Sequence, residues 1–276
     1  MIQREMNVIE ELEEIIGRKL PQVVEMKSDT FGVTVEHERV VGLGLYKKGV
    51  TSLPESIGDL TNLHHLYVHY NQLESIPETI GNLTNLLNLY VHNNELTSVP
   101  DTIGNLSNLR MLRVYNNQLT SVPESLWSLR NLDYLNVEGN QLTSLSESIG
   151  NLGSIIAVNF SKNQLKSVPE TIGNLTNVQY LYLFSNQLTS APESIGNLTN
   201  LRKLRLSDNQ LTFLPESIGN LTSLRKVYLE RNQLTFLPES IRNLASLEEL
   251  HLEGNALSSL PKSLRRLEEQ GCSIHL

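Results

Sequence analysis

Tyrosine, histidine and arginine side chains recur at matching places along this chain and could bind another molecule. All nine tyrosines occupy such places. Tyrosine and arginine are favoured at binding surfaces because each combines a large contact area with a polar group. We therefore predict a partner-binding surface, and its residues are Tyr46, His64, His65, Tyr67, His69, Tyr70, Tyr90, His92, Arg110, Arg113, Tyr115, Tyr134, Tyr180, Tyr182, Phe184, Arg202, Arg205, Tyr228 and Arg231.

The predicted binding residues fall mainly into two groups, within 64–115 and 180–231, and smaller side chains such as Ala157 and Ser161 separate them. Near the C-terminal end the equivalent positions turn acidic, with Glu248 and Glu249. An alternative explanation needs no ligand, because tyrosine favours β-strands and would stabilise an exposed sheet face by itself.

Two of the histidines suggest metal chemistry. His69 and His92 occupy the same place in neighbouring copies of a repeat, so their α-carbons are expected about 5 Å apart, the spacing between strands. The next position in that series is Tyr115, which leaves no obvious third ligand. We therefore predict no metal site and no cofactor, and expect exposed histidines that titrate near pH 6–7.

Catalytic patterns are missing from the sequence. It shows no nucleophile–base arrangement, no Cys/His zinc spacing and no phosphate-binding G-x-x-x-x-G-K motif, so we predict that the protein is not an enzyme. The net charge of −8 argues against general attraction to nucleic acid or to anionic membranes. Binding of single-stranded nucleic acid, with bases stacked on tyrosine and phosphates on arginine, is the alternative.

Several features favour an intracellular protein. The single cysteine, Cys272, allows no intramolecular disulfide. The first residues contain no apolar run of signal-peptide length, and no stretch approaches the length of a membrane span. We expect a cytoplasmic monomer that does not enter the membrane.

The elements that must position these side chains belong to a repeat of 23 residues. Its anchors are Asn71, Asn94, Asn117, Asn140, Asn163, Asn186, Asn209, Asn232 and Asn255, and Lys48 stands one period earlier. Around each anchor the sequence reads L-x-x-L-x-L-x-x-N-x-L, and such a fixed period indicates a solenoid. We predict a short strand at L-x-L, a turn whose asparagine side chain bonds the backbone in a stacked ladder, and a helical or 3₁₀ turn with proline at its first position.

Three parts follow from this period. Residues 1–39 are predicted to form an N-terminal cap, with a helix from about Glu5 to Lys19 ended by Pro21, and a β-hairpin. Residues 40–261 form ten repeats, and residues 262–276 form a C-terminal cap with a helix and a last edge strand. Caps are needed because the end repeats would otherwise expose their leucine core.

The repeat L-x-x-L-P-x-x-I-G-N-L-x-N-L resembles the leucine-rich repeat class of plant intracellular Ras-group-related proteins, Scribble-like scaffolds and stand-alone bacterial and archaeal repeat proteins. The resemblance implies an α/β solenoid, a horseshoe with a parallel concave sheet and short helical or 3₁₀ turns on the convex side. It also implies a non-catalytic module that binds a protein on the concave face, and a small GTPase is one such partner. A constant scaffold with variation on one face is also typical of an engineered binding scaffold.

Overall fold

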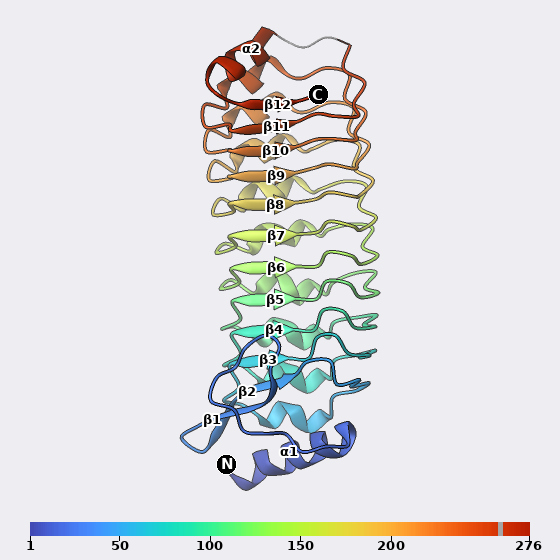
Figure 1. The fold of residues 1–276 in the computed structure, drawn as a ribbon, viewed down its shortest axis with the longest axis vertical. Coiled ribbons are helices and arrows are strands. Elements are labelled where there is room, and N and C mark those ends of the chain that lie inside the picture. The colour runs from blue at the N-terminus through green and yellow to red at the C-terminus, as the bar shows by residue number, and fades with distance from the viewer. Residues whose placement is uncertain (259–261) are drawn as a thin grey trace. The chain divides into compact units, whose positions relative to one another are not determined.

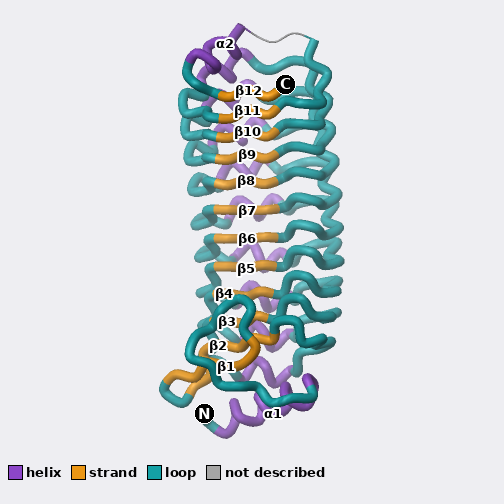
Figure 2. Tube along the Cα trace, viewed as in Figure 1, coloured by secondary structure: helices purple, strands orange, loops and turns teal. Residues whose placement is uncertain are grey.

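The computed structural model describes residues 1–258 and 262–276, which fall into two compact units, Met1–Asn140 and Gln141–Leu276. In each unit, short strands lie side by side and the 3₁₀ segments follow on the opposite side of the sheet (Figures 1 and 2). Among the described residues, no helix combines the length and the apolar character needed to cross a membrane.

The first unit begins with a helix and a hairpin. Helix α1 covers Gln3–Ile16, and strand β1 (Phe31–Glu36) pairs antiparallel with β2 (Arg39–Leu45). The strands after β2 are three residues long, and each pairs parallel with its sequence neighbour, beginning with β2 and β3. They are β3 (His65–Tyr67), β4 (Asn88–Tyr90), β5 (Met111–Arg113) and β6 (Tyr134–Asn136).

The second unit continues the same pattern. Its parallel strands are β7 (Ala157–Asn159), β8 (Tyr180–Tyr182), β9 (Lys203–Arg205), β10 (Lys226–Tyr228), β11 (Glu249–His251) and β12 (Ser273–His275). Helix α2 (Lys262–Glu269) precedes β12, and Gly271 between them has φ 92°. The predicted cap helix and last edge strand are confirmed.

Each strand from β2 to β10 is followed by a 3₁₀ helix of five residues. They are η1 (Glu55–Asp59), η2 (Glu78–Asn82), η3 (Asp101–Asn105) and η4 (Glu124–Ser128) in the first unit, and η5 (Glu147–Asn151), η6 (Glu170–Asn174), η7 (Glu193–Asn197), η8 (Glu216–Asn220) and η9 (Glu239–Asn243) in the second. The expected place of proline was wrong by one residue. Pro54, for example, is extended with ψ 152° and precedes η1, while its carbonyl accepts from Ile57 N at 3.0 Å.

The leucines of the repeat form the core. The middle residue of each three-residue strand points inward, and the leucines of the loops and the isoleucines of the 3₁₀ helices close the core from the other sides. In the first unit, for example, Leu66, Leu89 and Leu112 are aligned on adjacent strands and fully buried. Side chains on either side of this residue therefore project from the opposite face of the sheet.

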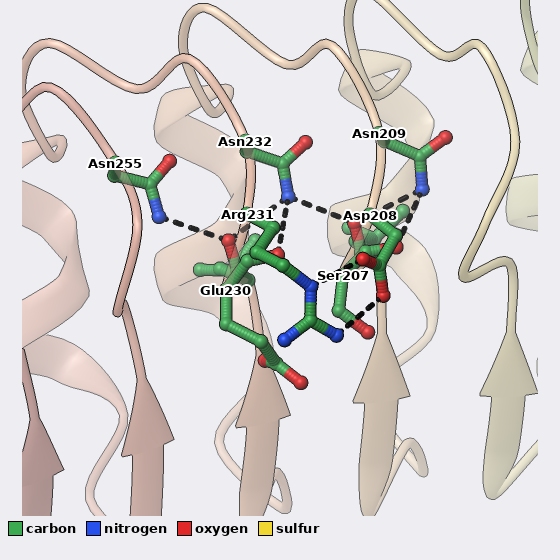
Figure 3. Close-up of polar contacts among 9 residues, drawn as sticks. Ser207, Asp208, Asn209, Glu230, Arg231, Asn232 and Asn255 are labelled. Atoms are coloured by element: carbon green, nitrogen blue, oxygen red, sulfur yellow. Dashed lines mark hydrogen bonds and ion pairs between the residues drawn. The ribbon is translucent and has the colours of Figure 1, made fainter.

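The anchor asparagines bond backbone groups of two successive repeats. Asn209 Oδ1 accepts from Leu188 N at 3.0 Å, and its Nδ2 donates to Leu183 O at 2.9 Å and Leu206 O at 3.0 Å. Figure 3 shows this residue beside Asn232 and Asn255, which repeat the pattern. The ladder is as predicted, and it satisfies backbone groups that the tight turn leaves unpaired.

The residue before each anchor has a left-handed backbone. Its φ is between 52° and 71° in ten successive copies, from Lys47 to Gly254, yet only two of them, Gly139 and Gly254, are glycine. From β3 to β11 this residue lies three positions after the end of the strand, as Tyr70 does after β3, and it belongs to the turn that holds the anchor asparagine. Tyr70 and Arg231, both predicted binding residues, stand at this position.

The N-terminal helix ends earlier than expected. Gly17, with φ 72°, caps α1, and the amide of Arg18 donates to Glu13 O at 3.1 Å. A left-handed glycine thus ends the helix, and not Pro21. The helix is attached through Glu5, a buried carboxylate that accepts from Val40 N at 2.9 Å and Arg39 Nε at 2.7 Å.

The division into 1–39, 40–261 and 262–276 stays a prediction, and the boundary at 261 lies outside the described residues.

Candidate binding surface

The predicted binding residues divide between the sheet faces of the two units. We call the surface formed by the predicted binding residues between Tyr46 and Tyr134 the first-unit face. The second-unit face is the surface formed by those between Tyr180 and Arg231. In each, residues 23 positions apart sit on neighbouring strands and form columns, as Tyr67 and Tyr90 do. A column therefore brings together side chains that the sequence separates.

One column of the first-unit face is a continuous ring stack. Tyr46 lies 4.9 Å from His69 between ring centroids, His69 lies 4.3 Å from His92, and His92 lies 4.1 Å from Tyr115. The two histidines are only 4% exposed. Each ring covers the faces of its neighbours, so the stack itself removes the histidines from water.

Burial changes the acid–base behaviour of both histidines. Desolvation lowers the pKa of His69 to about 4, helped by the nearby cation Arg113. It lowers the pKa of His92 to about 3, helped by His69 and Arg113. The expectation of exposed histidines that titrate near pH 6–7 is therefore wrong for this pair, because burial lowers both pKa values by more than the negative charge of Asp29 raises that of His69.

The neighbouring column is also packed internally. Tyr67 stacks on Tyr90 with centroids 4.5 Å apart, and Arg113 places its guanidinium carbon 4.5 Å from the centre of the Tyr90 ring. Both tyrosines are buried, and the Tyr90 hydroxyl donates to Met111 Sδ at 2.8 Å. Burial raises the pKa of each phenol. These rings stabilise the sheet whether or not a ligand binds.

The rest of the first-unit face is more open to solvent. Tyr70 is 44% exposed and Tyr134 is 42% exposed. Arg110 is exposed and lies 3.6 Å from Asp133. Half-buried residues complete this face, and they are Tyr46, His64, His65, Arg113 and Tyr115. Tyr70 and Tyr134 are therefore the rings that a partner can reach most fully.

The second-unit face carries cations with and without acidic partners. Lys226 contacts Glu249 at 2.6 Å, Arg225 contacts Glu248 at 3.1 Å, and Arg231 forms an ion pair with Asp208 (Figure 3). By contrast, no carboxylate of the described ranges lies within 4.0 Å of the cationic groups of Arg202, Lys203 or Arg205. These three charges are available to an anionic ligand.

Aromatic rings hold two of these three cations in place. The guanidinium of Arg205 lies between Phe184, at 4.5 Å, and Tyr228, at 5.1 Å from the ring centres. Lys203 Nζ lies 4.9 Å from the Tyr228 ring centre, and desolvation followed by the positive charge of Arg205 lowers the pKa of Lys203. Arg205 Nε is buried and makes no hydrogen bond within the described part of the chain.

An open groove of about 350 Å³ runs along this patch. Four cationic side chains and one carboxylate line it together with one tyrosine, and they are Tyr180, Arg202, Lys203, Arg225, Lys226 and Glu248. A smaller hollow of about 220 Å³ is lined by the same Arg202 and Arg225 together with four uncharged polar residues. The groove offers ion pairs beside an aromatic surface, an arrangement that suits acidic protein segments.

Potential metal ligands occur at two places in the described part of the chain. His69 and His92 stack face to face in the interior of the ring column, with no third ligand among the described residues. One group of three potential ligands does occur in that part of the chain, and it consists of His251, Glu253 and His275. The sequence reasoning did not bring these three together.

Sequence reasoning also missed two exposed rings. Phe213 and Phe236 are 42% and 53% exposed, one period apart, where other repeats have serine, as at Ser190. That exchange of serine for phenylalanine was a visible signal. In contrast, Trp127, the only tryptophan in the sequence, is buried in η4, so its side chain adds no second contact surface.

Comparisons with known proteins agree with this architecture. A family model described as a leucine-rich repeat region matches residues 41–132 and 122–230, and a second leucine-rich repeat model matches residues 223–244 and 246–267. A comparison with curated protein sequences found no match.

Solved structures with similar chains include a protein of Leptospira interrogans, a plant peptide hormone receptor and the PEPR1–AtPEP1 structure. A leucine-rich repeat protein of Leptospira interrogans is 28% identical, with 85% of this chain and 83% of that chain covered and a TM-score of 0.42. The plant peptide hormone receptor RGFR1, solved in complex with RGF2, is 27% identical over 92% of this chain and 46% of that chain, with a TM-score of 0.71.

The third structure, the PEPR1–AtPEP1 complex, is 28% identical over 88% of this chain and 43% of that chain, with a TM-score of 0.67. This chain thus spans less than half the length of the matched RGFR1 and PEPR1–AtPEP1 chains. The family models cover well over half of the chain, and the periodic strands, asparagine ladder and 3₁₀ turns agree with them. The chain therefore belongs to the leucine-rich repeat family, whose domains are protein-interaction modules.

Proposed function

We propose that this chain is a non-catalytic module that binds a protein partner on its strand-lined faces, and that the second-unit face receives a segment rich in aspartate and glutamate. The observation that carries this proposal is the groove in which no carboxylate of the described residues lies within 4.0 Å of the cationic groups of Arg202 and Lys203. The adjacent Arg205 adds a third such cation. A protein with a net charge of −8 that leaves three cations together on one face has concentrated its positive potential there.

The geometry favours a side chain with a carboxylate over a purely apolar ligand. The guanidinium groups of arginine bind carboxylates through paired hydrogen bonds, and these are among the stronger contacts at interfaces. Tyr180, Tyr182 and Tyr228 stand beside the cations and supply contact area at low entropic cost. The related receptor RGFR1 was solved in complex with RGF2, which supports this mode of use for the fold.

On the first-unit face we propose a second, mainly aromatic contact through Tyr70 and Tyr134. Tyr70 packs edge-to-face against Tyr46 and His69 of the ring stack in the free protein, so little order would be lost when it binds a partner. A small GTPase, the partner class that the family resemblance implies, belongs among the candidates to be tried, provided that it presents an acidic segment.

Selection from a random peptide library tests the proposal without knowledge of the partner. The intact chain should enrich peptides with clustered aspartate and glutamate, and the double variant Arg202→Glu with Arg205→Glu should not. The matched control is Arg242→Glu, an exposed arginine in η9, away from the strands. It should enrich the same acidic peptides as the unaltered chain.

Two results would contradict the proposal. One is enrichment of neutral or basic peptides by the unaltered chain, and the other is identical selection by the double variant. A parallel titration with mixed-sequence single-stranded DNA tests the nucleic-acid alternative, which Lys203 beside Tyr182 and Tyr228 would favour. Tight and salt-dependent binding of DNA, with no acidic peptide selected, would favour that alternative.

A further inference from the structure

The C-terminal end of the second unit contains a cluster of two histidines and a glutamate. Strands β11 and β12 are parallel with His251 opposite His275, and Figure 1 shows them side by side. The two imidazole rings stack with centroids 4.3 Å apart and an angle of 4°. Glu253 follows on the same side of the sheet, and its Oε1 lies 3.7 Å from His251 Nδ1.

These three residues can present their ligand atoms to one point. One potential ligand atom from each lies within 4.8 Å of the others. In a tetrahedral zinc site with bonds of about 2.0–2.1 Å, ligand atoms are about 3.3 Å apart. The His251–Glu253 distance is already close to this value. The His275 side chain is exposed, so it can turn toward the same point without disturbing the core.

A second observation concerns buried polar atoms of two of these residues. His251 Nε2 and Glu253 Oε2 are both buried, and neither has a hydrogen-bond partner in the described part of the chain. Buried polar atoms without partners each cost about 1–3 kcal/mol, so native proteins usually satisfy them. Here the unsatisfied nitrogen and oxygen belong to two residues of the same potential ligand group.

The surroundings increase the negative charge near the cluster. Glu249 Oε2 lies 3.6 Å from His251 Nε2, although Lys226 and the Tyr228 hydroxyl also bind that carboxylate, at 2.6 Å and 3.2 Å. Tyr228 covers the other face of the His251 ring at 4.6 Å and fixes its plane. The cluster is thus held from one side and open on the His275 side.

The stacked pair in the first unit provides an internal comparison. His69 and His92 are also 4.3 Å apart, yet they are buried inside their column and no acidic ligand joins them in the described residues. The pair at the C-terminal end differs by its exposure and by Glu253. Stacking alone therefore does not distinguish the two pairs, whereas access and the carboxylate do.

We propose that His251, Glu253 and His275 bind a divalent transition-metal ion, with Zn²⁺ as the best fit, and that the ion fastens β12 to β11. Two imidazole nitrogens and one carboxylate suit Zn²⁺, Co²⁺ or Ni²⁺, whereas Mg²⁺ and Ca²⁺ prefer sites made of oxygen. The fourth position is open to water or to a ligand from a partner. Because imidazole must be neutral to bind, protons compete with the metal and affinity falls in acid.

Isothermal titration calorimetry tests the site: any bound metal is removed from the intact chain, and Zn²⁺ is then added while the heat of binding is measured. We expect one Zn²⁺ per chain, and at least tenfold weaker binding for His275→Ala and for Glu253→Gln. His37→Ala, an exposed histidine in the turn between β1 and β2, is the control and should leave the affinity unchanged. Mg²⁺ should not compete at equal concentration.

A second readout separates metal binding from loss of the fold. The amide of Leu252 donates to His275 O at 2.8 Å across the two strands, so Zn²⁺ should slow its hydrogen exchange at least tenfold in the unaltered chain and not in His275→Ala. Circular dichroism of the variants without metal should match that of the unaltered chain. Absence of zinc binding, or equal binding by His275→Ala, would overturn the proposal.

Discussion

Acid should destabilise the first unit well before its carboxylates are protonated, because two buried histidines must stay neutral in the fold. The pKa of His69 is lowered to about 4 and that of His92 to about 3, from an ordinary value of 6.5. At pH values between these lowered pKa values and 6.5, the unfolded chain binds more protons than the folded one. Stability therefore rises with pH in this window, and it is lost as the pH falls below 6.5.

The magnitude follows from the unfolded state. At pH 5 a histidine with a pKa of 6.5 gains about 2 kcal/mol from protonation, since each pKa unit is worth about 1.4 kcal/mol. The folded residues gain almost nothing at that pH. For the pair we expect a loss of between about 2 and 4 kcal/mol from pH 7.5 to pH 5, where the lower figure allows for water at the ring edges.

Urea denaturation followed by the fluorescence of Trp127 measures this loss, because that residue is the only tryptophan and lies buried in the first unit. The variant His92→Phe keeps a ring between His69 and Tyr115 but cannot be protonated. It should remove about half of the difference between the two pH values, about 1–2 kcal/mol. His37→Ala, on the exposed hairpin turn, should leave the difference unchanged.

Burial of neutral histidines would not explain the effect if the unfolding free energy of His92→Phe depended on pH as strongly as that of the unaltered chain. The explanation fails more directly if the ring protons of His69 or His92, followed by NMR, shift with a midpoint near 6.5.

Three further predictions concern the repeat itself. Asn209→Ala should destabilise the second unit by about 3–5 kcal/mol, because it leaves Leu188 N and two backbone carbonyls unpaired. Urea denaturation followed by hydrogen exchange measures this loss, and a loss below about 1 kcal/mol would show that the asparagine ladder does not stabilise the fold. Gly196→Ala would place a Cβ 2.5 Å from Ser217 O of η8 and should cost about 1–3 kcal/mol, whereas Gly153→Ala, with open space around it, should not lower the melting temperature; equal effects would refute this. Ser185→Gly should raise the stability by up to about 1 kcal/mol because its φ of 53° suits glycine, and a clear decrease in the melting temperature would contradict it.

The sequence predicted the regular parts of the fold well, since the repeat period places equivalent residues on adjacent strands. The strands, the asparagine ladder and the 3₁₀ turns all follow from residues 23 positions apart. Ion pairs such as Arg231 with Asp208 also obey this spacing and could have been read from it.

Burial on the sheet face could not be read in the same way. Alternation along a strand says which way His92 points, but its exposure depends on the rings of His69 and Tyr115 that cover it. The sequence did not predict the cluster of His251, Glu253 and His275 for a related reason. His251 and His275 are 24 residues apart, because α2 replaces a shorter 3₁₀ turn, and a strict 23-residue register does not align them.

Recognition by the second-unit face is the central claim, and a map of backbone amide shifts tests it most directly. An acidic peptide selected by the intact chain would be added to isotopically labelled protein, and the spectra compared with those of Arg202→Glu with Arg205→Glu. We expect the largest changes in amide chemical shift on β8, β9 and β10, and we expect these changes to be lost in the double variant. The central claim would be contradicted if the largest shifts fell on η6–η9, or if the double variant bound the peptide unchanged.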